Sequence, residues 1–317
     1  MSDVKKIATR QAYGEALAEL GEKYPNLVVM DADLAASTKT AMFGKKYPER
    51  FFDAGIAEAN MVSMAAGLAT TGKIVFASSF AMFATGRVYE QIRNSIGYPH
   101  LNVKIAATHG GISVGEDGAS HQCIEDVSLM RNIPGMVVCV PSDYVEAKAA
   151  VQAAIDYDGP VFLRFGRSNV PVINDREDYK FELGKGVVLK EGTDVTVIGT
   201  GICVDSVMKA EEMLAKDGIN AEIINIHTIK PLDEELVIAS AKKTGRIVTV
   251  EEHSVIGGLG SAVCDAVCKN YPVPVMKIGV QDVFGTSGSA DALMQYYRLD
   301  AQGVYEQVKE FLEKGGK

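Results

Sequence analysis

Apolar and polar residues alternate along the chain in blocks that predict strands followed by helices. Short apolar runs rich in β-branched residues predict buried strands at 27–31, 74–78, 103–108, 136–140 and 161–165. Between them, helical spacing of apolar residues predicts helices at 58–71, 82–96 and 144–155. Because strands alternate with helices, we expect a mostly parallel sheet with crossover helices.

This alternation stops over a polar stretch at 173–183 and then starts again. The second series predicts strands near 195–198, 222–226, 247–250 and 275–278, with a last amphipathic helix at 304–312. We therefore predict an α/β protein with two open, mostly parallel-sheet domains. The first covers residues 1–172, a linker covers 173–190, and the second domain covers 191–317. A length of 317 residues fits two domains at about 150 residues each.

Charge and composition exclude several classes of protein. The net charge of −9 and the absence of long Lys/Arg blocks argue against nucleic-acid binding. No apolar stretch is long enough for a membrane span, and the N-terminal residues do not resemble a signal peptide. The five cysteines include no C-x-x-C pair, and Cys264 and Cys268 lack neighbouring ligands, so we predict no metal site. We expect a soluble, reduced, cytoplasmic protein.

The richest candidate for chemistry is T-H-G-G-I-S-V-G-E-D-G-A-S-H-Q, residues 108–122, which we call the histidine loop. It directly follows an expected strand, at the sheet edge where open α/β sheets bind ligands. Its glycines permit close approach of the backbone. We therefore expect His109, Asp117 and His121 to converge on a polar ligand.

A second candidate is Glu58, in the segment D-A-G-I-A-E-A-N-M. One interpretation is a solvated glutamate, which the helix dipole favours in a first turn. The other is a carboxyl partly desolvated by Ala57, Ala59 and Met61, which can share or donate a proton. The sequence alone leaves both open.

Several weaker candidates have a structural and a functional interpretation. Arg10, Ser37 and Arg167 could bind an anion, although each alone also fits an ordinary surface residue. Phe80 and Phe83 in S-F-A-M-F fit core packing or stacking on a heteroaromatic ring. The glycine turns at 199–201 and 257–261 resemble phosphate turns, but neither completes a nucleotide-binding motif.

Taken together, these motifs resemble transketolase. The resemblance is carried by G-I-A-E before an Ala/Met-rich helix, by S-F-A-M-F, and by H-x-x-x-x-x-G-E-D-G-x-x-H-Q. V-T-V-I-G-T-G, I-K-P-L-D and V-T-V-E-E-H extend it over the second half. It implies a thiamine-diphosphate pyrimidine-binding domain followed by a transketolase C-terminal domain. Pyruvate-dehydrogenase-type β subunits lack the histidine loop, and deoxyxylulose-phosphate synthases usually show a variant of it.

The resemblance implies roles residue by residue. Glu58 would hydrogen-bond N1′ of the thiamine aminopyrimidine, favouring the imino tautomer that removes the C2 proton. Phe80 and Phe83 would flank the pyrimidine, while a third family aromatic falls on Gly86. Asp117 and His121 would contact sugar hydroxyls, His121 as a catalytic residue. The residues that match the sugar-phosphate site are Arg10, Asp33, Ser37, His109 and Arg167.

The family holds the cofactor's diphosphate and Mg²⁺ (or Ca²⁺) with a G-D-G motif and a later Asn, which we do not find here. The resemblance therefore implies a C-terminal subunit that needs an N-terminal partner, in a heterotetramer with two copies of each. Together they would transfer a two-carbon ketol unit between sugar phosphates, as in the pentose phosphate pathway. A deoxyxylulose-phosphate synthase-like subunit, a 2-oxoacid dehydrogenase E1 β-like subunit and a non-catalytic homologue remain alternatives.

Overall fold

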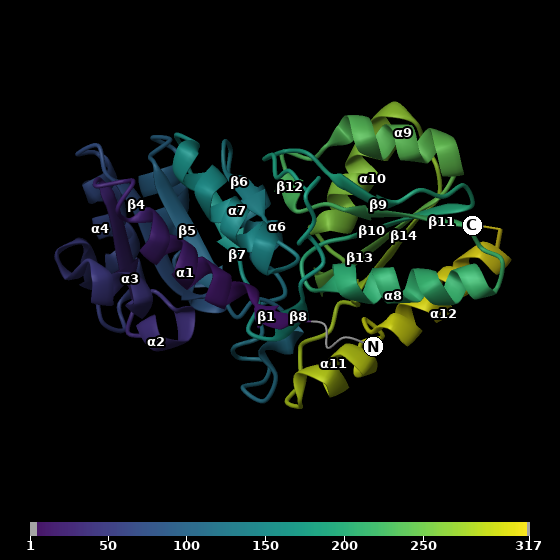
Figure 1. Cartoon of the computed structure of the whole chain (residues 1–317), viewed down its shortest axis with the longest axis horizontal. Helices are drawn as coiled ribbons and strands as arrows, with labels where there is room; N and C mark the ends of the chain where they lie inside the picture. Colours follow the sequence, from purple (N-terminus) through teal and green to yellow (C-terminus); the bar gives the residue numbers. More distant parts are fainter. Residues whose placement is uncertain (1–4, 316–317) are drawn as a thin grey trace.

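The structure is a computed structural model that describes residues 5–315. Two lobes lie side by side along the longest axis of the molecule, the N-terminal half in one and most of the C-terminal half in the other (Figure 1). Each lobe has its own sheet, in which most pairs of strands are parallel. The predicted α/β class with two mostly parallel-sheet domains is confirmed.

The first lobe is built on a sheet of seven strands. They are β2 (Leu27–Asp31), β3 (Phe51–Asp53), β4 (Ile74–Phe80), β5 (Val103–Thr108), β6 (Val137–Cys139), β7 (Val161–Arg164) and β12 (Thr228–Lys230). Their order is β12-β6-β7-β5-β4-β2-β3, and only β12 runs antiparallel to its neighbour. The strands expected at 27–31 and 103–108 have these bounds. The other three differ by one or two residues at their ends, as is usual for strand boundaries.

Helices cover both faces of this sheet. They are α1 (Thr9–Leu20), α2 (Ala35–Thr38), α3 (Ala41–Lys46), α4 (Glu58–Ala69), α5 (Tyr89–Gln91), α6 (Asp126–Arg131) and α7 (Tyr144–Asp156). Helices α1 and α7 share an apolar cluster on one face, and α4 packs into a second cluster on the other. Short 3₁₀ turns lie at Pro48–Arg50 and Ile112–Val114, and β1 (Lys6–Ala8) pairs antiparallel with β8 (Asn169–Pro171).

The continuous helix predicted at 82–96 is wrong in detail. π-helical segments cover Met82–Gly86 and Ile92–Gly97, and α5 lies between them. A π turn takes one residue more than an α turn, so it widens the helix locally and changes where the following side chains point. Apolar spacing cannot reveal such an insertion, because the apolar positions on either side still fit a helix.

The strand order reverses beside β2. The chain goes from β2 to β3 on one side and then crosses to β4 on the other. In open α/β sheets, ligands bind at the carboxyl ends of strands next to such a reversal. The loops that follow β2, β4 and β5 therefore meet where a ligand site is expected.

The second lobe has a five-stranded sheet. Its strands are β9 (Val187–Lys190), β10 (Val195–Gly199), β11 (Ala221–Asn225), β13 (Ile247–Ser254) and β14 (Val275–Val280), in the order β14-β13-β10-β11-β9. Its helices are α8 (Cys203–Lys216), α9 (Glu234–Thr244), α10 (Leu259–Asn270), α11 (Ala290–Tyr296) and α12 (Ala301–Glu313). The expected linker, residues 173–190, is irregular up to Gly186, and its last residues form β9.

The two lobes are joined by more than the connecting segment. Strand β12 belongs to the second half of the sequence but pairs with β6 of the first sheet. One apolar cluster includes residues of both halves, such as Met130, Val138 and Ile226. The lobes therefore share buried apolar surface. None of the helices within residues 5–315 is long and apolar enough to cross a bilayer.

Candidate active site

Arg10 links the segments that follow β2 and β5 at the carboxyl edge of the first sheet. It lies in the first turn of α1, and its Nη1 donates to the backbone carbonyl of Ser37 at 2.9 Å. The same nitrogen lies 3.2 Å from Nε2 of His109, in the loop after β5. Sequence reasoning grouped these residues only through the family resemblance, and the structure brings all three together. Ser37 does so through its backbone.

His109 is buried and held in one orientation. Its φ of 59° lies in the left-handed region, which non-glycine residues rarely adopt and which occurs often at functional sites. Its Nδ1 lies 2.8 Å from the hydroxyl of Thr108. Because a guanidinium can only donate, the Nε2 that faces Arg10 must accept, which places the ring proton on Nδ1. Burial, and then the positive charges of Arg10 and Arg167, lowers the pKa of His109 to about 3.

Three cations surround this histidine, namely Arg10, Lys39 and Arg167, which we call the cation cluster. Arg10, Arg167 and Lys39 each lie close enough to His109 for their positive charges to lower its pKa. Burial lowers the pKa of Arg10, and Arg167 lowers it further. These cations are half-buried and repel one another, so an anion would stabilise them, and Arg binds phosphate or carboxylate in a bidentate manner. The arrangement is therefore suited to bind an anionic group.

Aromatic rings line the adjoining part of the site. Phe80, at the end of β4, lies over His109 with ring centroids 3.8 Å apart. Phe83 lies nearly parallel to Phe80, with 6.2 Å between centroids and 19° between planes. The rings of His121 and Phe83 are nearly perpendicular, at 78°, with centroids 5.3 Å apart. These aromatic residues are thus not simple core packing, because they join the two histidines of the histidine loop.

Glu58 is buried, with 3% of its surface exposed, so its interpretation as a solvated glutamate is wrong. Both carboxylate oxygens accept from Nη1 of Arg87, at 3.0 and 2.9 Å. The guanidinium of Arg87 also lies 4.4 Å from the centre of the Phe83 ring, a cation–π contact. Sequence reasoning missed Arg87, which follows a π-helical turn and whose position no local pattern reveals.

The outer part of the histidine loop carries the remaining candidates. Asp117 is exposed, and its carboxylate lies 3.8 Å from Nη1 of Arg167, which also donates to the carbonyl of Val114. Asp33 is exposed at the end of the loop after β2, with φ of 63°. Among residues 5–315, the structure records no hydrogen bond or ion pair from the Asp33 side chain to the cation cluster.

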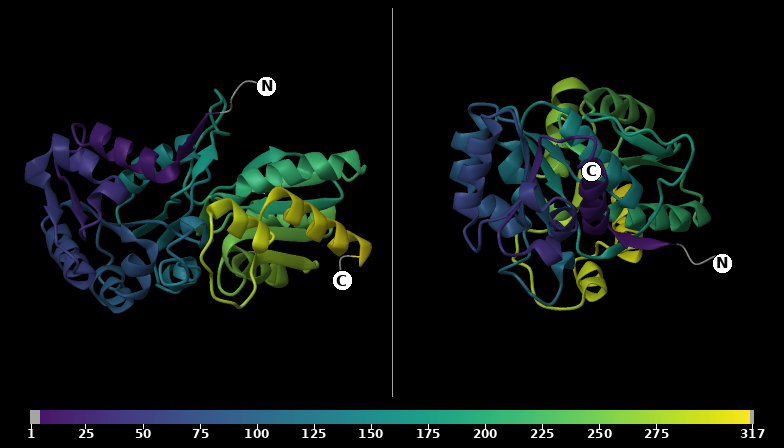
Figure 2. Two further views of the ribbon diagram at one scale, coloured as in Figure 1. Left: turned by 90° about the horizontal axis from the view of Figure 1, so that it is seen from below. Right: turned by 60° about the vertical axis from the view of Figure 1, so that its left-hand side comes forward.

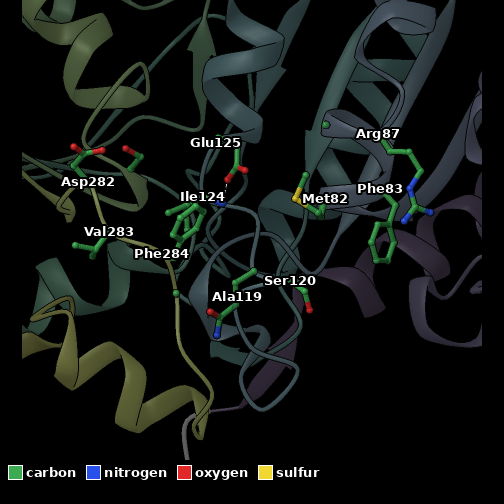
Figure 3. A pocket seen from close by; sticks show the side chains of 14 residues that line it. Met82, Phe83, Arg87, Ala119, Ser120, Ile124, Glu125, Asp282, Val283 and Phe284 are labelled. Atoms are coloured by element: carbon green, nitrogen blue, oxygen red, sulfur yellow. Dashed lines mark hydrogen bonds between the residues drawn. The ribbon is translucent and has the colours of Figure 1, made fainter.

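A cavity of about 740 Å³ adjoins this site and opens between the lobes (Figure 3). One wall carries Phe83, Arg87 and Ser120, and the other is the segment 282–285 of the C-terminal lobe. Phe284 of that segment is 87% exposed. The site therefore continues into apolar surface to which both halves of the sequence contribute.

The glycine turn at 257–261, considered above as a phosphate turn, already binds a carboxylate of this chain. The carboxylate of Glu251 accepts from the backbone N–H groups of Leu259 and Gly260, at 2.7 and 2.8 Å. These are the first amides of α10, which would otherwise be available to an anion. The cysteines are free thiols. Within residues 5–315, no group of three His, Cys, Asp or Glu side chains could hold a metal ion.

Comparison with known families agrees with both halves of the fold. The family model described as "Transketolase, pyrimidine binding domain" matches residues 5–172. The model described as "Transketolase, C-terminal domain" matches residues 184–304. The two matches together cover both lobes.

Similar proteins and structures point the same way. The chain is 53% identical over 307 residues to a "putative transketolase C-terminal section" of Methanocaldococcus jannaschii, covering 96% of each chain. It is 45% identical over 305 residues to "6-deoxy-6-sulfo-D-fructose transketolase subunit SqwH" of Clostridium sp., covering 96% of this chain and 94% of that one. A solved structure titled "Split gene transketolase, inactive beta4 tetramer" has a TM-score of 0.88 and 52% identity, covering 96% and 98%. This chain belongs to the transketolase family, of which it carries the pyrimidine-binding and C-terminal domains.

Proposed function

We propose that this chain is the C-terminal subunit of a thiamine-diphosphate-dependent transketolase that transfers a two-carbon ketol unit between ketose and aldose sugar phosphates. The observation that carries this proposal is one continuous set of contacts at a single sheet edge. It joins the buried carboxylate of Glu58, the parallel rings of Phe80 and Phe83, and the cations around His109. The names of two similar proteins, a C-terminal section and a split-gene product, support a subunit that acts with a partner.

The residues present fit the pyrimidine of thiamine diphosphate. Parallel aromatic rings offer an apolar stacking surface, and a buried carboxylate beside them can hold a proton on a ring nitrogen. When bound, the cofactor supplies a nucleophilic carbon for the ketose carbonyl. In our proposal Glu58 orients the ring and holds the proton at N1′, through the same carboxylate whose oxygens accept from Arg87.

The substrate would lie between the cation cluster and the histidine loop. Arg10, His109 and Arg167 would bind the sugar phosphate, with Asp33 and Ser37 at the rim of that subsite. Asp117 and His121 would contact the hydroxyls, with His121 next to the reacting atoms because its ring meets Phe83. A bound phosphate would compete with Asp117 for Arg167, which holds this carboxylate only loosely, at 3.8 Å.

The remaining parts of the active site would come from an N-terminal partner subunit. We propose that this partner holds most of the diphosphate and its Mg²⁺ or Ca²⁺ ion, as the family resemblance implies. The assembly would contain two copies of each subunit. The isolated chain would then bind thiamine diphosphate weakly and show no transfer activity.

Reconstitution tests this function directly. The chain is mixed with a candidate N-terminal subunit, thiamine diphosphate and Mg²⁺, and assayed with xylulose 5-phosphate as donor and ribose 5-phosphate as acceptor. Because one relative is named for a sulfo sugar, a 6-sulfonated ketose is tested as well. Transfer from any of these ketoses supports the proposal. Activity with pyruvate and with no ketose would instead indicate one of the alternative thiamine enzymes, and no activity of any kind a non-catalytic homologue.

A further inference from the structure

The histidine loop is held from outside its own domain. Ile112, near its start, is fully buried and belongs to the apolar cluster of the C-terminal lobe, which also contains Val197 and Leu293. Helix α11 and the segment before it, drawn in yellow, reach from the C-terminal lobe to the first lobe (Figures 1 and 2). One end of the loop is thus anchored in the other domain's core.

A charged side chain of the C-terminal lobe fixes the next residue. The carboxylate of Glu252, on β13, accepts a hydrogen bond from the backbone N–H of Ser113. A Cβ atom on Gly111 would lie only 2.3 Å from the Glu252 carboxyl carbon. This glycine therefore permits the close approach of Glu252, and its φ of 83° also suits glycine.

The C-terminal part of the loop is hydrogen-bonded to the segment 285–287. Gln122 is 3% exposed, and its amide nitrogen donates to the carbonyl of Thr286 at 2.8 Å. The same nitrogen lies within hydrogen-bonding distance of two carbonyls of the loop itself, at 3.1 and 3.2 Å. The hydroxyl of Ser287 donates to the carbonyl of Glu116. A Cβ on Gly285 would lie 1.8 Å from the amide oxygen of Gln122, so only glycine leaves this amide in place.

Asp117 and His121 lie between these anchors, and both are more exposed than the residues that fix the ends. We infer that the C-terminal domain positions the histidine loop, with Gln122 as a positioning residue held by the segment 285–287 and with Glu252 holding the opposite end. This inference rests on the proposed function for its kinetic consequence. It assigns the C-terminal domain a part in sugar binding, although none of the site residues expected from the sequence belongs to that domain.

The variant Gly285→Ala tests the inference with a small change. The added methyl group displaces the amide of Gln122, while the half-buried backbone of residue 285 tolerates alanine because its φ lies outside the left-handed region. Gly67→Ala, on an exposed turn of α4 with no neighbour within 4 Å, is the matched control. Hydrogen–deuterium exchange of the full chain reports the order of residues 110–122 without requiring activity.

We expect exchange over residues 110–122 to be about tenfold faster in Gly285→Ala and unchanged in Gly67→Ala, a factor that corresponds to about 1.4 kcal/mol. In the reconstituted complex, KM for the ketose should rise by about as much, while kcat and the affinity for thiamine diphosphate stay near wild type. A general loss of folding would instead weaken cofactor binding as well.

A double variant identifies the route of the effect. If Gly285→Ala acts through the Gln122 amide, it should add nothing in a Gln122→Ala background. Unchanged exchange in Gly285→Ala, or an additive effect in the double variant, overturns the inference. If the wild-type complex transfers no sugar, the proposed function fails, while the exchange experiment still decides whether the loop is held from the C-terminal domain.

Discussion

The buried state of His109 makes a testable link between pH and stability. Burial and the neighbouring guanidinium groups of Arg10 and Arg167 lower its pKa from 6.5 to about 3 in the folded chain. An unfolded chain binds this proton near pH 6.5, so between pH 3 and 6.5 the unfolded state holds more protons than the folded one. Stability that is fully present above pH 6.5 is therefore lost as the pH falls.

The magnitude follows from the size of this shift. Each pH unit below 6.5 costs about 1.4 kcal/mol until the folded pKa is reached, so His109 alone accounts for about 2 kcal/mol between pH 7 and pH 5. The variant His109→Asn removes this titration and keeps a polar side chain beside Arg10. His227, whose pKa burial lowers to about 4, is present in both proteins and cancels in the comparison.

Urea unfolding of wild type and His109→Asn at pH 7 and pH 5 gives the difference directly. The wild type should lose about 2 kcal/mol more than the variant over this range. NMR of the histidine ring signals provides a second readout: of the five histidines, His109 and His227 should fail to titrate between pH 8 and pH 5, and the signal missing from His109→Asn identifies His109. Equal losses in the two proteins, together with a normal titration of His109, would refute the assigned environment of the cation cluster.

Three further substitutions probe separate parts of the structure. Arg10→Lys should raise KM for the sugar phosphate about tenfold in the reconstituted complex, because a lysine cannot bridge Ser37, His109 and a phosphate; an unchanged KM contradicts the proposed subsite. Tyr13→Phe leaves the buried hydroxyl of Ser78 without its partner at 2.6 Å, and urea unfolding should show a loss of about 1–3 kcal/mol. Ile112→Ala should cost about 2–5 kcal/mol in the same assay, and a loss below about 1 kcal/mol would mean that this residue does not anchor the histidine loop.

Much of the first sheet could be predicted because its central strands are buried on both faces. Short, mostly apolar runs predicted the observed bounds of β2 and β5, and the loop after β5 stood out by its glycines, histidines and acids. Strand β12 could not be predicted to join this sheet. Its three residues carry no pattern that distinguishes a partner in the first lobe from one in the second.

The candidate site was harder to predict because its decisive contacts connect distant residues. Arg87 meets Glu58 only after a π turn, and Gln122 meets Thr286 across 164 residues. Ser37 contributes a backbone carbonyl, and a backbone contact of this kind cannot be predicted from the type of side chain. Residue type and spacing predicted which side chains could act, whereas their partners depend on the packing of the two lobes.

In the proposed function this chain supplies the carboxylate of a transketolase active site, and the variant Glu58→Ala removes that carboxylate. Turnover by the reconstituted complex is measured with a ketose phosphate and an aldose phosphate, and Glu235→Ala, an exposed carboxylate of the C-terminal lobe, is the control. We predict that Glu58→Ala loses at least about 100-fold in kcat while the complex still assembles, as expected for a group that controls a proton in the reaction. Near-wild-type turnover by Glu58→Ala would contradict the proposed function.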